Sequence, residues 1–348
     1  MGLLKGRKNR RLKGFPQPYS DETLSSWLFR CATSKHCVLT MEAAEDYVES
    51  SLRNGLDYDF SFGETFKRFC VRFGIDYAHC KKYFDIKNKN VIMSVRNRKS
   101  FCRQCLDQDV KYRSTPYWRR SWCRLDVAYC SMHKTLLITT REDFGLYRSW
   151  ESYMYFSDFC YERRGERNIY EFATLNFLGF RVQNWLFTNR NEIDRVSGAT
   201  QLIRDLLRSF LSLRTEFRYC GIARIAFGYS SQVPITHKDY HYSLCMYHGA
   251  NTSNSTHRKA ALIVLGVVLG FYGEQEIQKL QKTAFYSCGI FPSNPSEVGA
   301  TVLDLLDEPE REWYTSQFFN IPAIAGIDIN SRIDEYLSCI RMDKVGLI

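Results

Sequence analysis

Apolar residues recur every three or four positions along most of this chain, which is the spacing of the buried face of an α-helix. No segment shows the sustained apolar–polar alternation that is typical of a half-buried strand, and no internal repeat of fixed period is visible. We therefore predict a mainly α fold. Its helices are expected from about residue 22, from residue 40, and over 62–73, 76–84, 170–189, 199–217, 256–272, 275–284, 298–306 and 329–340.

Polar residues before the first two apolar stripes supply the expected helix caps. Ser20 or Asp21 can cap the first helix, and Thr40 can cap the second. Gly74 separates the third and fourth predicted helices, so this region has the order of a helix-turn-helix. Any small helical bundle gives the same pattern, and the prediction is therefore one of helix-turn-helix-like bundles, with plain packing as the alternative to DNA reading.

The bulk composition is that of a globular protein with large cores. The chain has 348 residues, of which 45% are hydrophobic, 25% charged and 15% aromatic, enough for two or three domains. The longest strongly apolar run, 260–272, is too short to cross a bilayer and is expected to be a buried helix. The N-terminus shows no apolar secretory core, so we expect a cytoplasmic protein without membrane segments, whose thirteen cysteines are reduced.

Positive charge is concentrated in the first part of the chain. Residues 1–200 carry 34 Lys and Arg against 23 Asp and Glu, whereas residues 201–348 carry 14 against 15. Such asymmetry is typical of a surface for nucleic acid, although solubility alone also explains it. The candidate nucleic-acid-binding residues are Arg7, Lys8, Arg10 and Arg11 in a basic arm, which could equally be a solvated tail, and Arg96, Arg98, Lys99, Arg119 and Arg120.

Four residues have the spacing of one metal site. Cys102 and Cys105 form a Cys-x2-Cys pair, and Cys130 and His133 form a Cys-x2-His pair 24 residues further on. Each pair can hold the same ion from one tight turn, and zinc favours sulfur and nitrogen donors in a tetrahedron. Four protein ligands leave no open position for water or substrate, so we predict one structural Zn²⁺, with ordinary buried residues as the alternative. Cys123 lies between the pairs and is a conceivable substitute ligand.

Other polar clusters are weaker candidates. A second metal site would need a helix that places its ligands on one face, and three tyrosines crowd that segment; the residues are His237, His241, Cys245 and His248. The sequence contains no phosphate loop, no Gly-x-Ser-x-Gly elbow and no His-Glu-x2-His motif, so it nominates no catalytic residue. One acidic group resembles a surface run: Asp304, Asp307, Glu308 and Glu310. Aromatic residues among the arginines of 96–124 either stack on nucleic acid or pack around the metal, and we expect packing for the tryptophans.

Two stretches resemble the TniQ/TnsD family of transposon proteins. Residues 16–30 read Pro-Gln-Pro-Tyr-Ser-Asp-Glu-Thr-Leu-Ser-Ser-Trp-Leu-Phe-Arg, similar to the family's opening Pro-x-Pro-Tyr-x-Asp-Glu followed by Leu, Ser, an aromatic residue and Arg. Residues 101–137 contain Cys-x2-Cys-Leu, a Tyr-Trp pair and Val-x2-Cys-x2-His followed by Leu, in the family's order. The resemblance covers about residues 15–140.

The resemblance implies a target-selection subunit that does not cut DNA. Such proteins connect a chosen insertion site to an AAA+ ATPase regulator, and shorter members resemble the TniQ of CRISPR-associated transposons, which binds a Cascade complex and its guide RNA as a homodimer. The length here favours the shorter kind. Many members carry a second cysteine finger, whereas residues 141–200 offer only Cys160, so a second zinc stays open.

Pattern and resemblance together divide the chain into four regions. These are a basic arm at 1–19, a helical, helix-turn-helix-like domain at 20–100, a zinc-finger module at 101–140 and a C-terminal helical TniQ-type domain at 141–348. The N-terminal bundle is expected to be held by Asp21, Glu22, Trp27 and Arg30, with Arg30 pairing with a carboxylate.

Three hypotheses on function follow. In the first, the protein is an adaptor that bridges Cascade to the AAA+ regulator. In the second, it is a stand-alone DNA-binding protein that selects an attachment site, and its affinity then falls steeply with salt. The third, a zinc-dependent enzyme, is disfavoured because the predicted metal site is closed.

Overall fold

The computed structural model describes residues 14–86, 89–140, 142, 144–159, 169–213, 220–226, 241–288, 291–317 and 327–342. Over these residues the fold is mainly α, as predicted, and the only sheet is the antiparallel pair β1 (Ser100–Phe101) and β2 (Ile138–Thr139). Contacts divide the chain into two units. The first comprises the described parts of Met1–Lys89, Arg103–Ser121 and Glu142–Tyr161, and the second those of Asn90–Cys102, Trp122–Arg141 and Glu162–Ile348. The four regions expected from the sequence stay a prediction.

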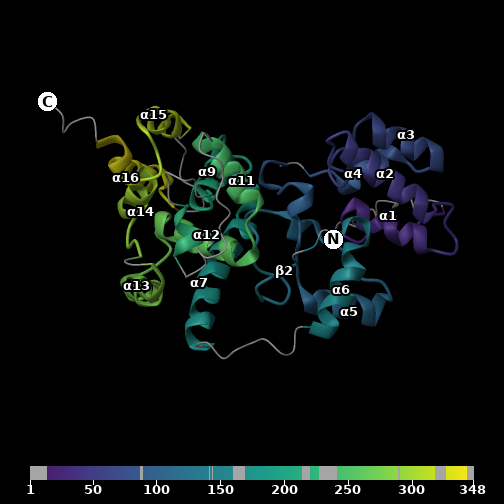
Figure 1. Ribbon diagram of the computed structural model, residues 1–348, viewed down its shortest axis with the longest axis horizontal. Helices are drawn as coiled ribbons and strands as arrows, with labels where there is room; N and C mark the ends of the chain where they lie inside the picture. Colours follow the sequence, from purple (N-terminus) through teal and green to yellow (C-terminus); the bar gives the residue numbers. More distant parts are fainter. Residues whose placement is uncertain are drawn as a thin grey trace, which may run out of the picture. The chain divides into compact units, whose positions relative to one another are not determined.

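The first unit consists of short helices packed in pairs (Figure 1). Helix α1 packs on α2, α2 on α3, α3 on α4, and α5 on α6, while the 3-10 helix η4 contacts α1, α2 and α6. The bounds are α1 (Leu24–Thr33), α2 (Met41–Arg53), α3 (Glu64–Phe73), α4 (Tyr77–Phe84), α5 (Arg103–Arg113), η4 (Gly145–Tyr147) and α6 (Arg148–Phe159). Three further 3-10 helices are η1 (Lys89–Val91), η2 (Val95–Asn97) and η3 (Arg120–Cys123).

The cap of α1 differs from the expectation. Thr23 caps this helix, because its hydroxyl accepts a hydrogen bond from the Ser26 N–H. The prediction of Ser20 or Asp21 was wrong, since the Asp21 carboxylate instead accepts hydrogen bonds from the N–H and hydroxyl of Ser121. For α2 the prediction is confirmed: the Thr40 side chain accepts from the N–H of Ala43.

The segment before α1 is held by the side chains of Trp27 and Arg30. The indole Nε1 of Trp27 donates to the Pro16 carbonyl at 2.7 Å, and Arg30 Nη2 donates to the Gln17 carbonyl at 2.9 Å. Arg30 also forms a bidentate ion pair with Glu22, with N···O distances of 2.7 and 2.6 Å, which confirms the expected carboxylate partner. Its guanidinium lies 3.9 Å from the centre of the Tyr19 ring. The Pro-x-Pro-Tyr-x-Asp-Glu motif therefore has a structural role in this unit.

Helices α3 and α4 form the predicted helix, turn and helix. Gly74 ends α3 in the left-handed conformation with φ of 65°, which glycine adopts without a steric penalty. Ile75 is buried and anchors the turn, and the Asp76 carboxylate caps α4 by accepting from the His79 N–H. The turn thus has three residues, within the length that helix-turn-helix motifs use.

The second unit is built around α12 (Ser255–Val268), whose described side chains are almost all buried (Figure 1). It packs against α7, α9, α10, α14 and α16. This confirms that the apolar run at 260–272 begins in a buried helix, and none of the described helices is long and apolar enough to span a membrane. The other bounds are α7 (Ile169–Thr188), α8 (Arg190–Ile193), α9 (Ala199–Phe210), α10 (Ile222–Ile225), α11 (Tyr242–Asn251), α13 (Glu274–Cys288), α14 (Pro295–Leu303), α15 (Glu308–Ser316) and α16 (Ile329–Met342).

Helix α9 is shorter than expected. It ends at Phe210, whereas the pattern predicted a helix over 199–217, of which 214–219 lie outside the described residues. The chain leaves the helix because its next backbone groups bond elsewhere: the Leu211 carbonyl accepts from the Arg224 side chain, and the Leu213 N–H donates to the Cys245 carbonyl. Tertiary contacts therefore override a favourable helical sequence here.

A buried carboxylate in the second unit is neutralised by two arginines. Asp126 accepts from Arg124 at 2.8 and 2.9 Å and from Arg190 at 2.8 Å, and its side chain is only 6% exposed. Burial alone would raise the pKa of Asp126, but the charges and hydrogen bonds of Arg124 and Arg190 outweigh it and lower that pKa to about 2.

This ion pair predicts a pH dependence of stability. The folded pKa of Asp126 lies below its unfolded value, so the stabilisation is complete above about pH 5 and is lost as the pH falls towards 2. It should amount to about 2 kcal/mol near neutral pH and roughly half of that at pH 3. The check is the difference in free energy of unfolding between the wild type and Asp126→Asn, measured from pH 6 to pH 3. A difference that stays constant over this range would contradict the assignment.

Candidate metal centre

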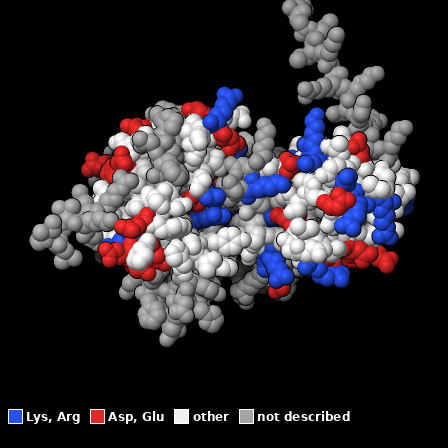
Figure 2. All heavy atoms as spheres, turned by 90° about the horizontal axis from the view of Figure 1, so that it is seen from above, with Lys and Arg blue, Asp and Glu red and all other residues white. Residues whose placement is uncertain are grey.

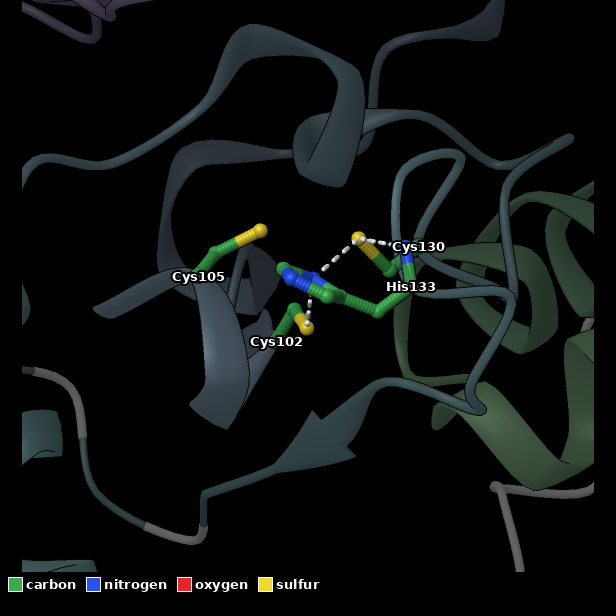
Figure 3. A group of neighbouring side chains, drawn as sticks. All are labelled: Cys102, Cys105, Cys130 and His133. Atoms are coloured by element: carbon green, nitrogen blue, oxygen red, sulfur yellow. Dashed lines mark hydrogen bonds between the residues drawn. The ribbon is translucent and has the colours of Figure 1, made fainter. Parts of the chain in front are cut away.

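Cys102 and Cys105 are brought together by the start of α5. Cys102 follows β1 and directly precedes the helix, and Cys105 lies in its first turn. A step of three residues is close to one helical turn, so the two thiols face the same side (Figure 3). The strand β1 holds this point in place through its register with β2, Ser100 opposite Thr139 and Phe101 opposite Ile138.

Cys130 and His133 lie in a tight turn. The Cys130 N–H donates to the Thr135 carbonyl at 2.9 Å, and the Lys134 N–H donates back to the Cys130 carbonyl at 2.8 Å. Lys134 adopts a left-handed conformation with φ of 55°, which closes the turn. The His133 N–H points at the Cys130 Sγ from 3.5 Å. This short hairpin turn is continued by the bridge of Tyr129 with Leu136, in agreement with the hairpin pairing that the metal module needs.

The four donors have the separations of a single tetrahedral site. One donor atom from each of Cys102, Cys105, Cys130 and His133 lies within 4.8 Å of the others. The His133 Nδ1 is 3.4 Å from the Cys102 Sγ and 3.5 Å from the Cys130 Sγ (Figure 3). A zinc tetrahedron with bonds of about 2.3 Å to sulfur and 2.0 Å to nitrogen has sulfur–nitrogen edges of roughly 3.6 Å, so the residues fit the ion.

The surroundings of the four donors suit a structural ion. All three cysteines are buried and His133 is half-buried. Four protein ligands fill a tetrahedron, and the site therefore offers an ion no vacant position for a substrate. Cys123 is also buried, but it does not belong to this group, so the structure favours the four predicted ligands over the alternative.

The second proposed cluster does not assemble in the part of the chain that the structure describes. His237 lies outside the described residues. His241 caps α11 by accepting from the Ser243 N–H, and Cys245 is buried in that helix. No described residue of this set joins a group with metal-ligand geometry.

The candidate nucleic-acid-binding residues occupy different environments. Arg7, Lys8, Arg10 and Arg11 lie outside the described residues. Arg96 is exposed and Lys99 is half-buried. The remaining three are engaged inside the protein: Arg98 donates to the Met93 carbonyl, Arg119 forms a bidentate ion pair with Asp109, and Arg120 donates to the Tyr83 and Ser20 carbonyls. Nucleic-acid contact by this set stays a prediction, and Arg96 is its most accessible described member.

The surface charge is mixed on the face that Figure 2 draws. Lys and Arg side chains lie beside Asp and Glu side chains there, rather than in one continuous positive area. The aromatic residues near the metal ligands divide as expected: Trp118 and Trp122 are each 1% exposed and pack in the interior, whereas Tyr112 is 71% exposed. The tryptophans are thus core residues.

Two buried ion pairs were not foreseen from the sequence. Arg148 pairs with Asp59, which also accepts from the Ser25 N–H, and Arg119 pairs with Asp109. Burial raises the pKa of Asp109, and the charge and hydrogen bond of Arg119 oppose that rise. Neither pair has a sequence signal, because the partners are ten or more positions apart and no helical period joins them.

The comparisons with known proteins agree with the motifs. The TniQ family model matches residues 14–137, a range that contains the Pro-x-Pro-Tyr-x-Asp-Glu motif and all four metal ligands. No curated protein and no solved structure matches the chain. A TniQ domain indicates a family of transposition target-selection proteins. The chain therefore contains a TniQ domain, which spans residues 14–137.

Proposed function

We propose that this protein is a non-catalytic adaptor of transposon target selection, which bridges an RNA-guided Cascade complex to an AAA+ regulator. The observation that carries the proposal is the TniQ domain at 14–137 together with its closed Cys₃His donor set. A site filled by protein ligands stabilises structure, and a subunit built around it is suited to binding partners rather than to chemistry. The subunit is expected to be a homodimer, on the strength of the resemblance to shorter members of the family.

The metal in this proposal is one Zn²⁺ ion. The donor set of three sulfurs and one nitrogen is the kind that zinc and few other biological ions prefer. When bound, the ion cross-links the start of α5 to the turn at 130–135. Metal binding would then be coupled to folding of this module, because the thiolates must lose their protons to coordinate.

Copurification tests the Cascade arm of the proposal. The tagged protein, expressed with Cascade subunits and guide RNA, should elute with the RNA-containing complex and with the AAA+ regulator added in a second step. Light scattering on the free protein measures the homodimer. A protein that ignores the guide-RNA complex but shifts a specific duplex DNA would reject the RNA-guided version and leave the alternative below.

The helix-turn-helix arrangement of α3 and α4 favours a second candidate function, direct binding of duplex DNA. The solvent-facing positions of this pair are basic, and five cationic side chains are exposed: Lys67, Arg68, Arg72, Lys81 and Lys82. In a helix-turn-helix the second helix enters the major groove, so α4 would present its two lysines to the duplex. The protein would then select an attachment site without a guide RNA.

The salt dependence of binding tests this alternative. If α4 contacts phosphates, Lys81→Ala/Lys82→Ala should reduce the slope of log affinity against log salt by about 2, one for each contact removed. The matched control is Arg53→Ala, which removes an exposed cation of α2 that pairs with Glu49. An unchanged slope for the double variant, or an equal loss for the control, would reject DNA reading by α4.

A further inference from the structure

Two cysteines outside the metal centre lie in contact at the end of α1. The chain folds back there, because the Ser34 N–H donates to the Cys31 carbonyl and the Cys37 N–H donates to the Ser34 carbonyl, each at 3.1 Å. This double turn brings the thiols of Cys31 and Cys37 into a hydrogen bond. Both cysteines are reduced in the structure.

The two thiols have opposite environments. Cys31 is fully buried, and burial raises its pKa, to which the hydrogen bond and charge of Cys37 add. Cys37 is partly exposed, and the hydrogen bond from the Cys31 thiol lowers its pKa to about 7, with the N–H groups of Leu39 and Val38 acting in the same direction against burial. A thiolate at Cys37 is therefore held by three donors and is reachable from solvent.

The charged groups around the pair are few. Arg30 and Glu22 face Cys31 from α1 and from the segment before it, with opposite effects on the Cys31 thiol. Lys35 and His36 precede Cys37 in the loop, and both are exposed. The hydrogen bond between the two sulfurs, rather than a neighbouring cation, therefore contributes most to the stabilisation of the Cys37 thiolate.

We propose that Cys31 and Cys37 are a reversible dithiol–disulfide couple that hydroperoxides oxidise. The Cys37 thiolate attacks one peroxide oxygen, the O–O bond breaks, and the departing hydroxide takes up a proton to become water, which leaves Cys37 as a sulfenic acid. The Cys31 sulfur, on losing its proton, then attacks the Cys37 sulfur; the S–S bond forms and the hydroxyl of the sulfenic acid leaves as a second water. Two electrons pass in total from the two thiols to the peroxide, and a dithiol reductant reverses the reaction by exchange.

The product is geometrically local. A bond between Cys31 and Cys37 closes a loop of few residues at the end of α1, beside the helix that carries Arg30. Reactive cysteines of this type combine a low thiol pKa, solvent access and a resolving cysteine nearby, and this pair has all three. Cys70 and Cys80, in α3 and α4, provide the contrast within the same unit, because both are buried and burial raises the pKa of Cys80 to about 12.

Peptide mass spectrometry of the full-length, metal-loaded protein tests the proposal. After one equivalent of hydrogen peroxide and blocking of free thiols, the 31–37 disulfide should appear, while Cys70 and Cys80 stay blocked as thiols. Iodoacetamide labelling of Cys37 should reach half its maximal rate near pH 7, against about pH 8.5 for an ordinary exposed thiol. Metal content is measured in the same samples, so that oxidation at the metal ligands is seen separately.

Two variants make the result decisive. In Cys31→Ala the sulfenic acid at Cys37 has no resolving thiol, so a dimedone adduct should accumulate at Cys37 in place of the disulfide. In Cys37→Ser neither product should form, and Cys31 should stay reduced. Peroxide treatment that leaves the wild-type pair reduced, or that oxidises Cys80 at the same rate as Cys37, would overturn the proposal.

Discussion

Replacing Cys105 or Cys130 with serine is expected to release the bound metal and to lower the free energy of unfolding by an amount on the order of 5 to 10 kcal/mol. Both thiols are buried members of the four-donor group, and a closed zinc site with three ligands left cannot complete its tetrahedron. The loss is large because the ion, rather than an apolar core, joins the start of α5 to the turn at 130–135. Metal analysis and thermal unfolding of the two variants measure the effect.

Cys123→Ser is the matched control for these substitutions. This cysteine is as buried as the ligands and lies between the two pairs in the sequence, but it is outside the donor group. It should retain one metal ion per chain and lose only the stability that a buried polar substitution costs, about 1 to 3 kcal/mol. Release of the metal from Cys123→Ser, with full retention in Cys105→Ser, would exchange the roles of the two residues and contradict the assignment.

Arg30→Met is expected to lower the free energy of unfolding by about 3 to 5 kcal/mol, because it leaves the Glu22 carboxylate without its ion-pair partner in a buried position. Glu22 is 0% exposed and Arg30 is 9% exposed, and the pair is bidentate. The variant also removes the hydrogen bond to the Gln17 carbonyl that holds the segment before α1. Urea unfolding followed by tryptophan fluorescence reports the change directly, since Trp27 lies in the same helix.

Two further variants separate the cause. Glu22→Gln/Arg30→Met removes both charges and should recover part of the loss, since a neutral buried pair carries no uncompensated charge. Arg53→Met breaks an exposed pair, whose side chains are 74% and 66% exposed, and should change stability by less than about 1 kcal/mol. A loss in Arg53→Met as large as in Arg30→Met would show that the buried pair has no special weight.

Much of the first unit could be predicted because its signals are local. A helix cap needs one side chain and a backbone N–H three positions away, as at Thr40 and Asp76. A left-handed turn between helices needs one glycine, as at Gly74. The metal site was equally accessible to sequence reading, because each ligand pair lies within a single turn and the donor chemistry selects the ion.

The helices that escaped prediction bury polar residues. In α6 the most buried described side chains are Arg148, Ser149 and Ser152, whereas Met154 and Tyr155 are exposed, so the apolar spacing that reveals a helix is absent. In α15 the buried positions include Glu310, which accepts from the Tyr242 N–H and completes a capping box with Asp307. The interpretation of this acidic stretch as a surface run was therefore wrong for Glu310.

Buried arginines set the other limit of sequence reading. Arg98 and Arg119 belong to a basic segment and resemble surface cations, but their partners are a backbone carbonyl and a carboxylate that only the fold brings near. A charge run in a sequence gives the number of cations and not which of them are compensated. The exposed lysines and arginines of α3 and α4 were passed over for the same reason, because they are scattered at helical spacing rather than clustered.

X-ray absorption spectroscopy at the zinc edge tests the central claim most directly, namely that a closed structural metal site lies within the TniQ domain. The folded protein should show three sulfur neighbours at about 2.3 Å and one nitrogen at about 2.0 Å, with no water in the first coordination shell. A zinc-bound water together with fewer than three sulfurs, or folded protein that contains no metal at all, would contradict it.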